Sequence, residues 1–456
     1  MENSIDFEKF SRYSKPGPRY TSYPTALEFN SDFKYEEYIK YLKANKNPLS
    51  IYVHLPFCRS ACYFCGCNVV FTSKGDKLSR YIEYLKKEID LLAKVLDTKK
   101  EIIQFHFGGG TPTYYQADEL DEIMNYIKSK FPNWSDEAEI SVEIDPRFFN
   151  EEQMKIFKKH GFNRVSFGVQ DFDEKVQKEI HRIQPFELTK KAVDLARKYG
   201  IESINTDLIY GLPFQSLKSF QETLKLAKSL DPDRFAIFNY AHVPWLKKTM
   251  RKFDETTLPT PDEKLKILKF TIDYLTSNGY KMIGMDHFAK PEDELFGAIA
   301  KGELHRNFQG YTTKGGATLI GIGLTSIGEG DSYYAQNFKK MSEYENAIDQ
   351  GKLPFERGVN LSEDDLIRKY VIMELMANFK VDIKRVEDKF KIDFQDYFED
   401  DIKKLKEFEE ANLLEMSKDK IEVSPTGTML IRNIAMAFDA YMEKYKNNKK
   451  SFSKTV

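Results

Sequence analysis

The stretch LSIYVHLPFCRSACYFCGCNVV, residues 49–70, joins an apolar run to a loop that holds all four cysteines of the chain. Residues 49–57 form a near-continuous apolar, β-branched and aromatic run, which is typical of a strand buried in a parallel sheet. The cysteines follow at once, in the spacing C-x3-C-x2-C-x-C. The stretch therefore predicts a buried strand whose carboxyl end carries a thiol-rich loop.

The pattern of this first strand recurs through the first two-thirds of the chain. Further apolar runs predict strands at 102–110, 138–146, 164–170, 203–213, 234–240 and 281–288. Amphipathic stretches between them, such as 81–96, 187–200 and 219–230, predict helices. Strands that alternate with helices every ~30 to 40 residues are typical of a (β/α) barrel. We therefore predict an α/β fold with a full or partial TIM-like barrel.

The periodicity changes near residue 360. Helical runs at 361–379 and 394–414, followed by a short hairpin, predict a smaller, mainly helical domain. Its helices are acidic or mixed in charge, so a DNA-binding wing is not expected. We predict an N-terminal arm or lid over 1–48, the barrel over 49–357 and a helical C-terminal cover domain over 358–456.

Composition restricts the class of protein. The 456 residues are 41% hydrophobic, and 69 Lys and Arg against 71 Asp and Glu leave a net charge of −2. We expect a soluble, cytoplasmic monomer that binds no nucleic acid and has no membrane span, since no signal peptide and no apolar run of about 18 residues is present. The cytoplasm keeps thiols reduced, so clustered cysteines there indicate a metal or redox site rather than disulfide bonds.

Small or polar residues stand at the carboxyl ends of six predicted strands. They are the cysteine loop, residues 108–113, Glu143 with Asp145, Gln170, Asp207, and residues 239–242. In a barrel these ends meet at one face, which carries the active site. Ordinary turns would explain the glycines and prolines but not a glutamate or a glutamine after apolar strand residues. The sequence therefore predicts one site at this face.

The cysteine spacing favours an iron–sulfur cluster over zinc. Structural zinc sites usually draw two separated pairs of ligands, whereas Cys58, Cys62 and Cys65 form one short run that can hold three corners of a 4Fe-4S cluster. Three protein ligands leave one iron open for chemistry. Cys67, one residue beyond Gly66, is placed awkwardly for the same cluster. A zinc knuckle made from all four cysteines remains the alternative.

These motifs carry a resemblance to a known family. The C-x3-C-x2-C loop and the GGGTPT segment (108–113) resemble the radical S-adenosylmethionine (SAM) superfamily. A longer series resembles the family of oxygen-independent coproporphyrinogen III oxidases: GPRYTSYPTALEF (17–29), YVHLPFC with YFCGCN (52–68), FGGGTPT (107–113), EIDPR (143–147), FGVQDF (167–172), DLIYGLP (207–213), FNYAH (238–242), IGMDHFA (283–289), HRNFQGYTT (305–313) and LIRNIAMAFD (430–439). These segments run nearly end to end and in the same order.

The resemblance implies a barrel of the radical SAM type and a specific reaction. It is the oxidative decarboxylation of two propionate side chains of coproporphyrinogen III to vinyl groups, which gives protoporphyrinogen IX in anaerobic haem biosynthesis. The implied cofactors are a 4Fe-4S cluster and two SAM molecules, and an external donor supplies electrons. A haem chaperone of the same superfamily and a zinc-stabilised structural protein remain as alternatives.

The resemblance also implies roles for individual residues. Cys58, Cys62 and Cys65 are the implied cluster ligands, and Cys67 is a required catalytic thiol that does not bind the cluster, since the chaperone relatives lack a cysteine there. The implied SAM contacts are Tyr52, Phe64, Gly109, Gly110, Thr111, Glu143, Gln170, Arg182, Asp207, Ala241 and Ile327. From the residues alone, Phe64 could equally pack in the core and Arg182 could equally be a surface cation.

Substrate contacts are inferred from charge. A buried propionate needs a cationic or hydrogen-bonding partner. The candidates in the matched segments are Arg19, Tyr20, His305, Arg306 and Asn307. The first two belong to the N-terminal arm, which could close over the mouth of the barrel as a lid. For residues 305–307, a polar loop with internal hydrogen bonds is the alternative.

Overall fold

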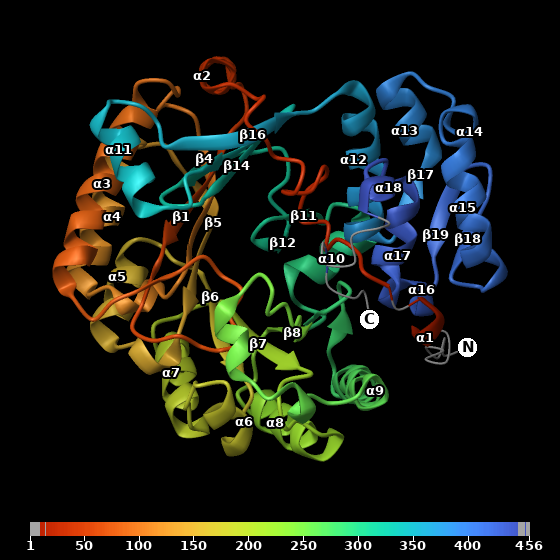
Figure 1. The fold of residues 1–456 in the computed structure, drawn as a ribbon, viewed down its shortest axis with the longest axis horizontal. Helices are drawn as coiled ribbons and strands as arrows, with labels where there is room; N and C mark the ends of the chain where they lie inside the picture. The colour runs from red at the N-terminus through yellow and green to blue at the C-terminus, as the bar shows by residue number, and fades with distance from the viewer. Residues whose placement is uncertain (1–9, 14, 446–451, 453–456) are drawn as a thin grey trace.

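The computed structural model describes residues 10–13, 15–445 and 452. The predicted arm and cover domain extend further, to residues 1 and 456, and those parts of both predictions lie outside the described residues. Figure 1 shows a curved sheet with helices on its outer side and a helical domain at the C-terminal end of the chain. The predicted α/β fold class is confirmed.

Seven parallel strands form the wall of a partial barrel. In spatial order they are β13 (Thr318–Ile322), β1 (Leu49–Leu55), β4 (Ile102–Gly109), β5 (Trp134–Ile144), β6 (Arg164–Gln170), β7 (Ser203–Tyr210) and β8 (Arg234–Asn239). The connecting helices are α3 (Gly75–Ala93), α4 (Ala117–Lys130), α5 (Glu151–Lys159), α6 (Glu174–Glu179), α7 (Phe186–Lys198) and α8 (Leu217–Ser229). The carboxyl ends of all seven strands therefore meet at one face.

The run 281–288 is not the single strand that its apolar pattern predicts. The chain forms β9 (Lys281–Met282), bends at residues 284–286 and returns as β10 (His287–Ala289), which pairs antiparallel with β9 and β8. Hydrophobic periodicity indicates burial in a sheet but carries no information on strand direction. The seventh parallel strand is instead β13, which pairs with β1 on the far side of the sheet.

Short additional strands flank the parallel wall, and all of their pairings except one are antiparallel. Beyond β13 the sheet continues as β14 (Ile327–Gly330), β15 (Tyr333–Asn337) and β16 (Phe355–Asn360). There are also two small two-stranded sheets. One pairs β2 (Phe57–Cys58) with β3 (Val70–Phe71) in parallel, and the other pairs β11 (His305–Asn307) with β12 (Gly310–Thr312) antiparallel. The remaining helices of this part are α2 (Tyr35–Ala44), α9 (Pro261–Ser277), α10 (Glu294–Lys301) and α11 (Met341–Asp349).

The C-terminal part is mainly helical, as predicted, and its hairpin gains a third strand. Its helices are α12 (Glu363–Asn378), α13 (Ile383–Phe390), α14 (Phe394–Tyr397), α15 (Glu399–Glu410), α16 (Pro425–Met429), α17 (Ile431–Ala435) and α18 (Met442–Tyr445). β17 (Lys380–Asp382) joins β18 (Leu414–Met416) and β19 (Lys420–Val423) in one sheet. The first described helix, α1 (Phe10–Tyr13), lies beside this part (Figure 1), where Tyr13 stacks on Phe408 with 5.2 Å between ring centroids.

One apolar core joins the barrel to the C-terminal part. Leu49 of β1, Val371 of α12 and Ile434 of α17 belong to the same cluster of buried side chains, and each is 0% exposed. Tyr20 of the arm belongs to it as well. Burial of aliphatic and aromatic surface on this scale is the main contribution that holds the parts together.

Candidate active site at the carboxyl ends of the strands

The inner face of the barrel is lined by polar side chains. Along β7, buried positions alternate with half-buried ones, and two of the half-buried side chains are Asn205 and Asp207. Ser166 of β6 donates to Oδ2 of Asp207 (2.8 Å), and Nδ2 of Asn205 donates to Oδ1 (2.7 Å). Because side chains alternate between the two faces of a strand, Asn205 and Asp207 share one face of β7, opposite the buried Ile204 and Leu208.

The cysteine loop follows β1 at this face. Cys58, Cys62 and Cys65 are half-buried, Cys67 is exposed, and all four are free thiols. Cys58 Sγ lies 3.3 Å from Oγ1 of Thr111, and the backbone N–H of Cys67 donates to Cys65 Sγ (3.4 Å). The strand, the glycine segment after β4 and the loop's own backbone therefore fix the positions of the thiols.

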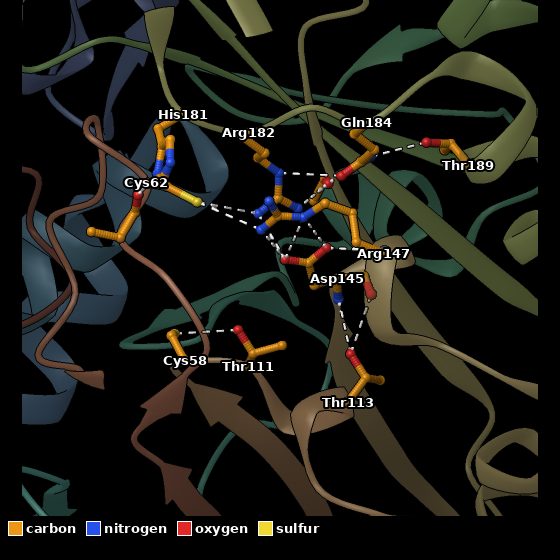
Figure 2. Close-up of polar contacts among 12 residues, drawn as sticks. Cys58, Cys62, Thr111, Thr113, Asp145, Arg147, His181, Arg182, Gln184 and Thr189 are labelled. Atoms are coloured by element: carbon orange, nitrogen blue, oxygen red, sulfur yellow. Dashed lines mark hydrogen bonds and ion pairs between the residues drawn. The ribbon is translucent and has the colours of Figure 1, made fainter. Parts of the chain in front are cut away.

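Two guanidinium groups lie beside the loop (Figure 2). Nη2 of Arg147 is 3.7 Å and Nη1 of Arg182 is 3.8 Å from Cys62 Sγ. Asp145 joins them, with Oδ2 at 2.7 Å from Arg147 and 3.0 Å from Arg182. Arg182 also donates to the carbonyl of Gly168 (2.6 Å) and is 7% exposed. The surface-cation interpretation of Arg182 is therefore wrong.

The thiols differ in acidity. Burial raises the pKa of Cys58 to about 12, although the hydrogen bond with Thr111 lowers it. The hydrogen bond from the Cys67 thiol lowers the pKa of Cys65 to about 6, and the same contact raises the pKa of Cys67. Thiolate is the form that binds iron. Three thiols with two adjacent guanidiniums fit a cluster with anionic ligands, because the cations offset the ligand charge.

The glycine segment passes close to β1 and its following turn. Gly109 has φ of 119°, and a Cβ there would lie 2.8 Å from the His54 ring. At Gly110 a Cβ would lie 2.7 Å from the backbone of Pro56. Both glycines are therefore required by the packing of the strand ends themselves, in addition to any ligand.

Glu143 presents a carboxylate to the open face. Its Oε2 accepts a hydrogen bond from the N–H of Gly109 (3.2 Å), and Oε1 lies 3.4 Å from Nε2 of His106. Burial raises the pKa of Glu143, but the contacts with His106 and Gly109 outweigh it and leave the pKa below its ordinary value. The side chain is nevertheless 49% exposed, so an ionised carboxylate is available to a cationic ligand.

Asp207 has a different environment. Burial raises its pKa to about 6, against the hydrogen bond from Ser166, and the Glu143 charge raises it further. Gln170 lies at the end of β6 with φ of 70°, a conformation that few non-glycine residues adopt, beside a register shift in the strand pairing. The two residues face the same interior from neighbouring strands.

Tyr52 and His54 connect β1 to the cysteine loop. The Tyr52 hydroxyl lies 3.0 Å from Nδ1 of His54, whose Nε2 lies 3.0 Å from the Asn68 carbonyl oxygen. Tyr52 also stacks on His106, with 5.8 Å between ring centroids. His54 is buried and serves the structural role expected for a histidine at a strand end.

The apolar candidates lie in two walls. Phe64 is partly buried and packs against a separate buried cluster that includes Val176 and Tyr240, the neighbour of Ala241. Ile327, at the start of β14, packs against the cluster of Phe29 and Tyr334 on the other side of the barrel. Phe64 thus makes core contacts, as one of its two interpretations predicted.

The five substrate candidates have different surroundings. Nη1 of Arg19 lies 3.4 Å from Oδ2 of Asp286. Tyr20 is buried and its hydroxyl donates to Oδ2 of Asp439 (2.8 Å), so it contacts the C-terminal part. Arg306 is buried, whereas its neighbour His305 is exposed. On the other side, Oδ1 of Asn307 accepts hydrogen bonds from the N–H groups of residues 309 and 310, where the chain turns into β12.

Sequence reasoning missed the carboxylate–guanidinium pair beside Cys62. Asp145 was predicted only as a polar residue at a strand end; it accepts from the Arg147 N–H (3.1 Å) and is also buried between two cations. The available signal was the arginine in EIDPR, at the carboxyl end of a predicted strand. Asp286 was missed because it lies where the predicted single strand bends.

Two features are absent from the part of the chain that the structure describes. In the ranges that the structure describes, no group of three or more His, Cys, Asp or Glu side chains is arranged to hold a single metal ion. Across the same ranges, none of the helices combines the length and the apolar composition needed to cross a bilayer.

Comparisons with family models match two parts of the chain. The model of the radical SAM superfamily matches residues 52–227. The model of the HemN C-terminal domain matches residues 361–430. The first match contains the cysteine loop and strands β1 to β7, and the second lies in the mainly helical C-terminal part.

Similar proteins match over almost the whole chain. An oxygen-independent coproporphyrinogen III oxidase from Helicobacter pylori strain J99 is 58% identical over 99% of this chain and 100% of its own length. A protein of the same name from Escherichia coli K12 is 42% identical over 99% of this chain and 98% of its own length. The solved structure described as coproporphyrinogen III oxidase (HemN) from Escherichia coli, a radical SAM enzyme, superposes with a TM-score of 0.93 at 41% identity, and the match covers 97% of this chain and 100% of that one.

Proposed function

The chain belongs to the oxygen-independent coproporphyrinogen III oxidases of the radical SAM superfamily, and we propose that the carboxyl ends of its barrel strands form the active site of that enzyme. The reaction is the oxidative decarboxylation of two propionate side chains of coproporphyrinogen III, which gives protoporphyrinogen IX. The observation that carries the assignment of the site is the loop of three half-buried thiols with two guanidiniums beside Cys62. Relatives with this name match end to end, so the haem-chaperone and zinc alternatives are not supported.

The cofactors are a 4Fe-4S cluster and SAM, which supply the one-electron chemistry that amino-acid side chains cannot provide. In the proposed site Cys58, Cys62 and Cys65 hold the cluster. Arg147 and Arg182 offset the negative charge of its thiolate ligands. The four cysteines are free in the structure, which supports this use of the loop.

Polar side chains of the interior would bind SAM. The Glu143 carboxylate is a suitable acceptor for a cationic amino group, and Gly109, Gly110 and Thr111 line the same loop. We place a second SAM molecule at Gln170, Arg182, Asp207 and Ala241, supported by their positions on β6, β7 and the segment after β8. The apolar walls of Phe64 and Ile327 and the ring of Tyr52 would keep water away from the cofactors.

We also propose roles for the three parts of the chain and for an external electron donor. Residues 1–48, 49–357 and 358–456 act as an arm, a catalytic barrel and a cover. The arm is supported by the hydrogen bond from Tyr20 to Asp439, which joins the first part to the third. We infer a cytoplasmic monomer that receives electrons from an external donor, and the free thiols support a reducing compartment.

Anaerobic reconstitution tests the function. The full chain is incubated with iron and sulfide, and then with coproporphyrinogen III, SAM and a low-potential reductant. We expect formation of protoporphyrinogen IX and release of two carbon dioxide molecules per substrate, measured by chromatography after oxidation to the porphyrin. A reconstituted cluster that forms no protoporphyrinogen under these conditions would contradict the assignment.

A further inference from the structure

Three arginines from distant segments meet near one carboxylate. Arg19 comes from the arm, Arg306 from β11 and Arg432 from α17, and Asp286 lies at the bend before β10. Nη1 of Arg19 is 3.4 Å from Asp286, and the charges of both Arg19 and Arg306 lower the pKa of Asp286. Burial, followed by repulsion from Arg19, lowers the pKa of Arg432 to about 9. Arg19 and Arg306 therefore both lie close enough to Arg432 to repel its charge.

Arg306 has donors without partners. It is 9% exposed, and its Nε and Nη1 are buried but form no hydrogen bond with any described residue. Its guanidinium lies 4.6 Å from the centroid of the Tyr311 ring, a contact that leaves Nε and Nη1 available to an anion. Buried guanidinium donors left unpaired are costly and rare, and they indicate a ligand that completes the site.

Asp286 cannot balance the cluster. One of its oxygens faces Arg19, and the other lies 2.6 Å from Nδ1 of His287. A single carboxylate shared between these groups leaves a surplus of positive charge in a region mostly closed to solvent. A tetrapyrrole with several propionates supplies the missing negative charges.

The cluster lies beside the proposed catalytic groups. The His287 charge lowers the pKa of Asp207, which is one of the proposed SAM contacts. Nη2 of Arg19 donates to the backbone carbonyl of Asn239 (3.4 Å), the last residue of β8, and the guanidinium lies 5.6 Å from the centroid of the Phe238 ring. The cations therefore lie at the rim of the barrel mouth, with an aromatic ring next to them.

We propose that Arg19, Arg306 and Arg432 form the receptor for propionate carboxylates of the substrate, with Arg19 and Arg306 in direct contact and Arg432 as a positioning residue. The proposal rests on the proposed function and names the substrate groups that this part of the site recognises. Bidentate hydrogen bonds from guanidinium to carboxylate provide both charge and geometry for this recognition.

Arg432 acts through the arm. Its Nε donates to the Pro18 carbonyl (2.8 Å) and its Nη2 to the Gly17 carbonyl, directly before Arg19 in the chain. These bonds place the Arg19 guanidinium over the barrel mouth. Loss of Arg432 should therefore weaken substrate binding even though its own donors bond to the backbone.

Binding of two porphyrins that differ only in charge tests the proposal. Coproporphyrin III carries four carboxylates, and its tetramethyl ester carries none. Dissociation constants are measured by fluorescence quenching under anaerobic conditions for the full reconstituted chain and for Arg306→Gln, Arg306→Lys and Arg432→Gln. Arg80→Gln is the matched control, because Arg80 pairs with Glu345 on the outer surface and its side chain is 60% exposed.

We expect Arg306→Gln to weaken binding of the acid about tenfold or more, with binding of the ester unchanged. Arg306→Lys should recover part of the loss, since it restores the charge but not the planar donors. Arg432→Gln should also weaken binding of the acid, and Arg80→Gln should have no effect. If a variant has a lowered melting temperature, we compare the ratio of its dissociation constants for the acid and the ester. General destabilisation weakens both to the same extent and therefore leaves this ratio unchanged.

Equal loss of acid and ester binding in Arg306→Gln, or no loss of either, would overturn the inference. Activity of the wild-type chain separates this result from the proposed function. A chain that forms protoporphyrinogen while Arg306→Gln retains full preference for the acid disproves only the receptor. A wild-type chain that forms no product disproves the function itself.

Discussion

At the scale of single residues, Cys67 differs from the other cysteines. It is exposed while the three proposed ligands are half-buried, and it contacts Cys65 through its backbone N–H. Its position one residue beyond Gly66 already separated it from the ligands in the sequence. A role as a thiol near the cofactors, without a bond to iron, is consistent with both observations.

Replacement of Cys67 tests this division of roles. Cys67→Ser should leave the iron and sulfide content and the visible absorption of the reconstituted chain unchanged, and should reduce product formation at least a hundredfold, because the thiol is lost but the ligands remain. Cys65→Ser is the control, and it should lose most of the iron. Loss of the cluster in Cys67→Ser would show that Cys67 is a ligand.

Residue types and spacing were enough to identify the candidate residues, but not to predict the environment of each side chain. The cysteine loop, the glycines and Glu143 were found from the sequence because they directly follow predicted strands. The burial of Arg182 could not be found in this way. It depends on Asp145 and Cys62, which lie 37 and 120 positions away in the chain.

At the scale of elements, a buried carboxylate connects α3 to the turn after β13, to the end of β15 and to α11. Glu88 accepts hydrogen bonds from the Tyr344 hydroxyl (2.6 Å), the Gly323 N–H (2.8 Å) and Nδ2 of Asn337 (2.7 Å). Burial raises its pKa to about 7, although these hydrogen bonds lower it. Glu88 thus titrates near neutral pH on the helix that follows the cysteine loop.

This carboxylate should make stability depend on pH. The pKa of Glu88 in the folded chain is above the value near 4.3 in an unfolded chain. The folded state therefore binds more protons between about pH 4 and 7, and the free energy of unfolding falls by up to about 3 kcal/mol as the pH rises through that interval. Melting temperatures of wild type and Glu88→Gln, measured from pH 5 to 7.5, check the effect.

Glu88→Gln should show a smaller fall in melting temperature with pH than the wild type, because its side chain cannot ionise. Glu83→Gln on the same helix is the control, since Glu83 is 64% exposed and should leave the wild-type slope intact. Parallel slopes in wild type and Glu88→Gln would contradict the assigned titration.

Element types were more predictable than element directions. The alternation of buried strands and amphipathic helices placed six parallel strands of the wall, each within a few residues of its observed position. The run 281–288 was assigned to the wall as one strand, but its chain reverses at 284–286. Strand β13 was not predicted, because its partner β1 is about 270 residues earlier and no local pattern marks that pairing.

At the scale of the whole molecule, the two ends of the chain hold each other. The arm forms hydrogen bonds with the C-terminal part through Tyr20 to Asp439 and through Arg432 to residues 17 and 18. The shared apolar core includes side chains from both parts. The sequence predicted an arm and a cover as separate regions, but contacts across more than 400 residues could not be predicted from local patterns.

The attachment of the arm can be measured by proteolysis. Tyr20, directly after Arg19, is 1% exposed, so we expect trypsin to cut after Arg19 mainly when the arm leaves the C-terminal part. The double variant Tyr20→Phe with Arg432→Gln loses three hydrogen bonds, each worth about 1 kcal/mol or more, so cleavage there should accelerate at least tenfold. Mass spectrometry of the N-terminal fragment gives the rate.

Lys403→Gln is a suitable control for this experiment, since its side chain is 55% exposed and pairs only with neighbours on its own helix among the described residues. Cleavage of the double variant at the wild-type rate would mean that the arm is held by other contacts.

The bonds between Arg432 and the arm also set an order of events during translation. The carbonyl of Gly17 accepts its hydrogen bond from Arg432, which is synthesised 415 residues later. At about 5 to 20 residues per second, a ribosome needs roughly twenty seconds or more to reach it. These bonds can therefore fix the arm over the barrel mouth only after almost the whole chain has been synthesised, and a polypeptide that terminates before Arg432 lacks them.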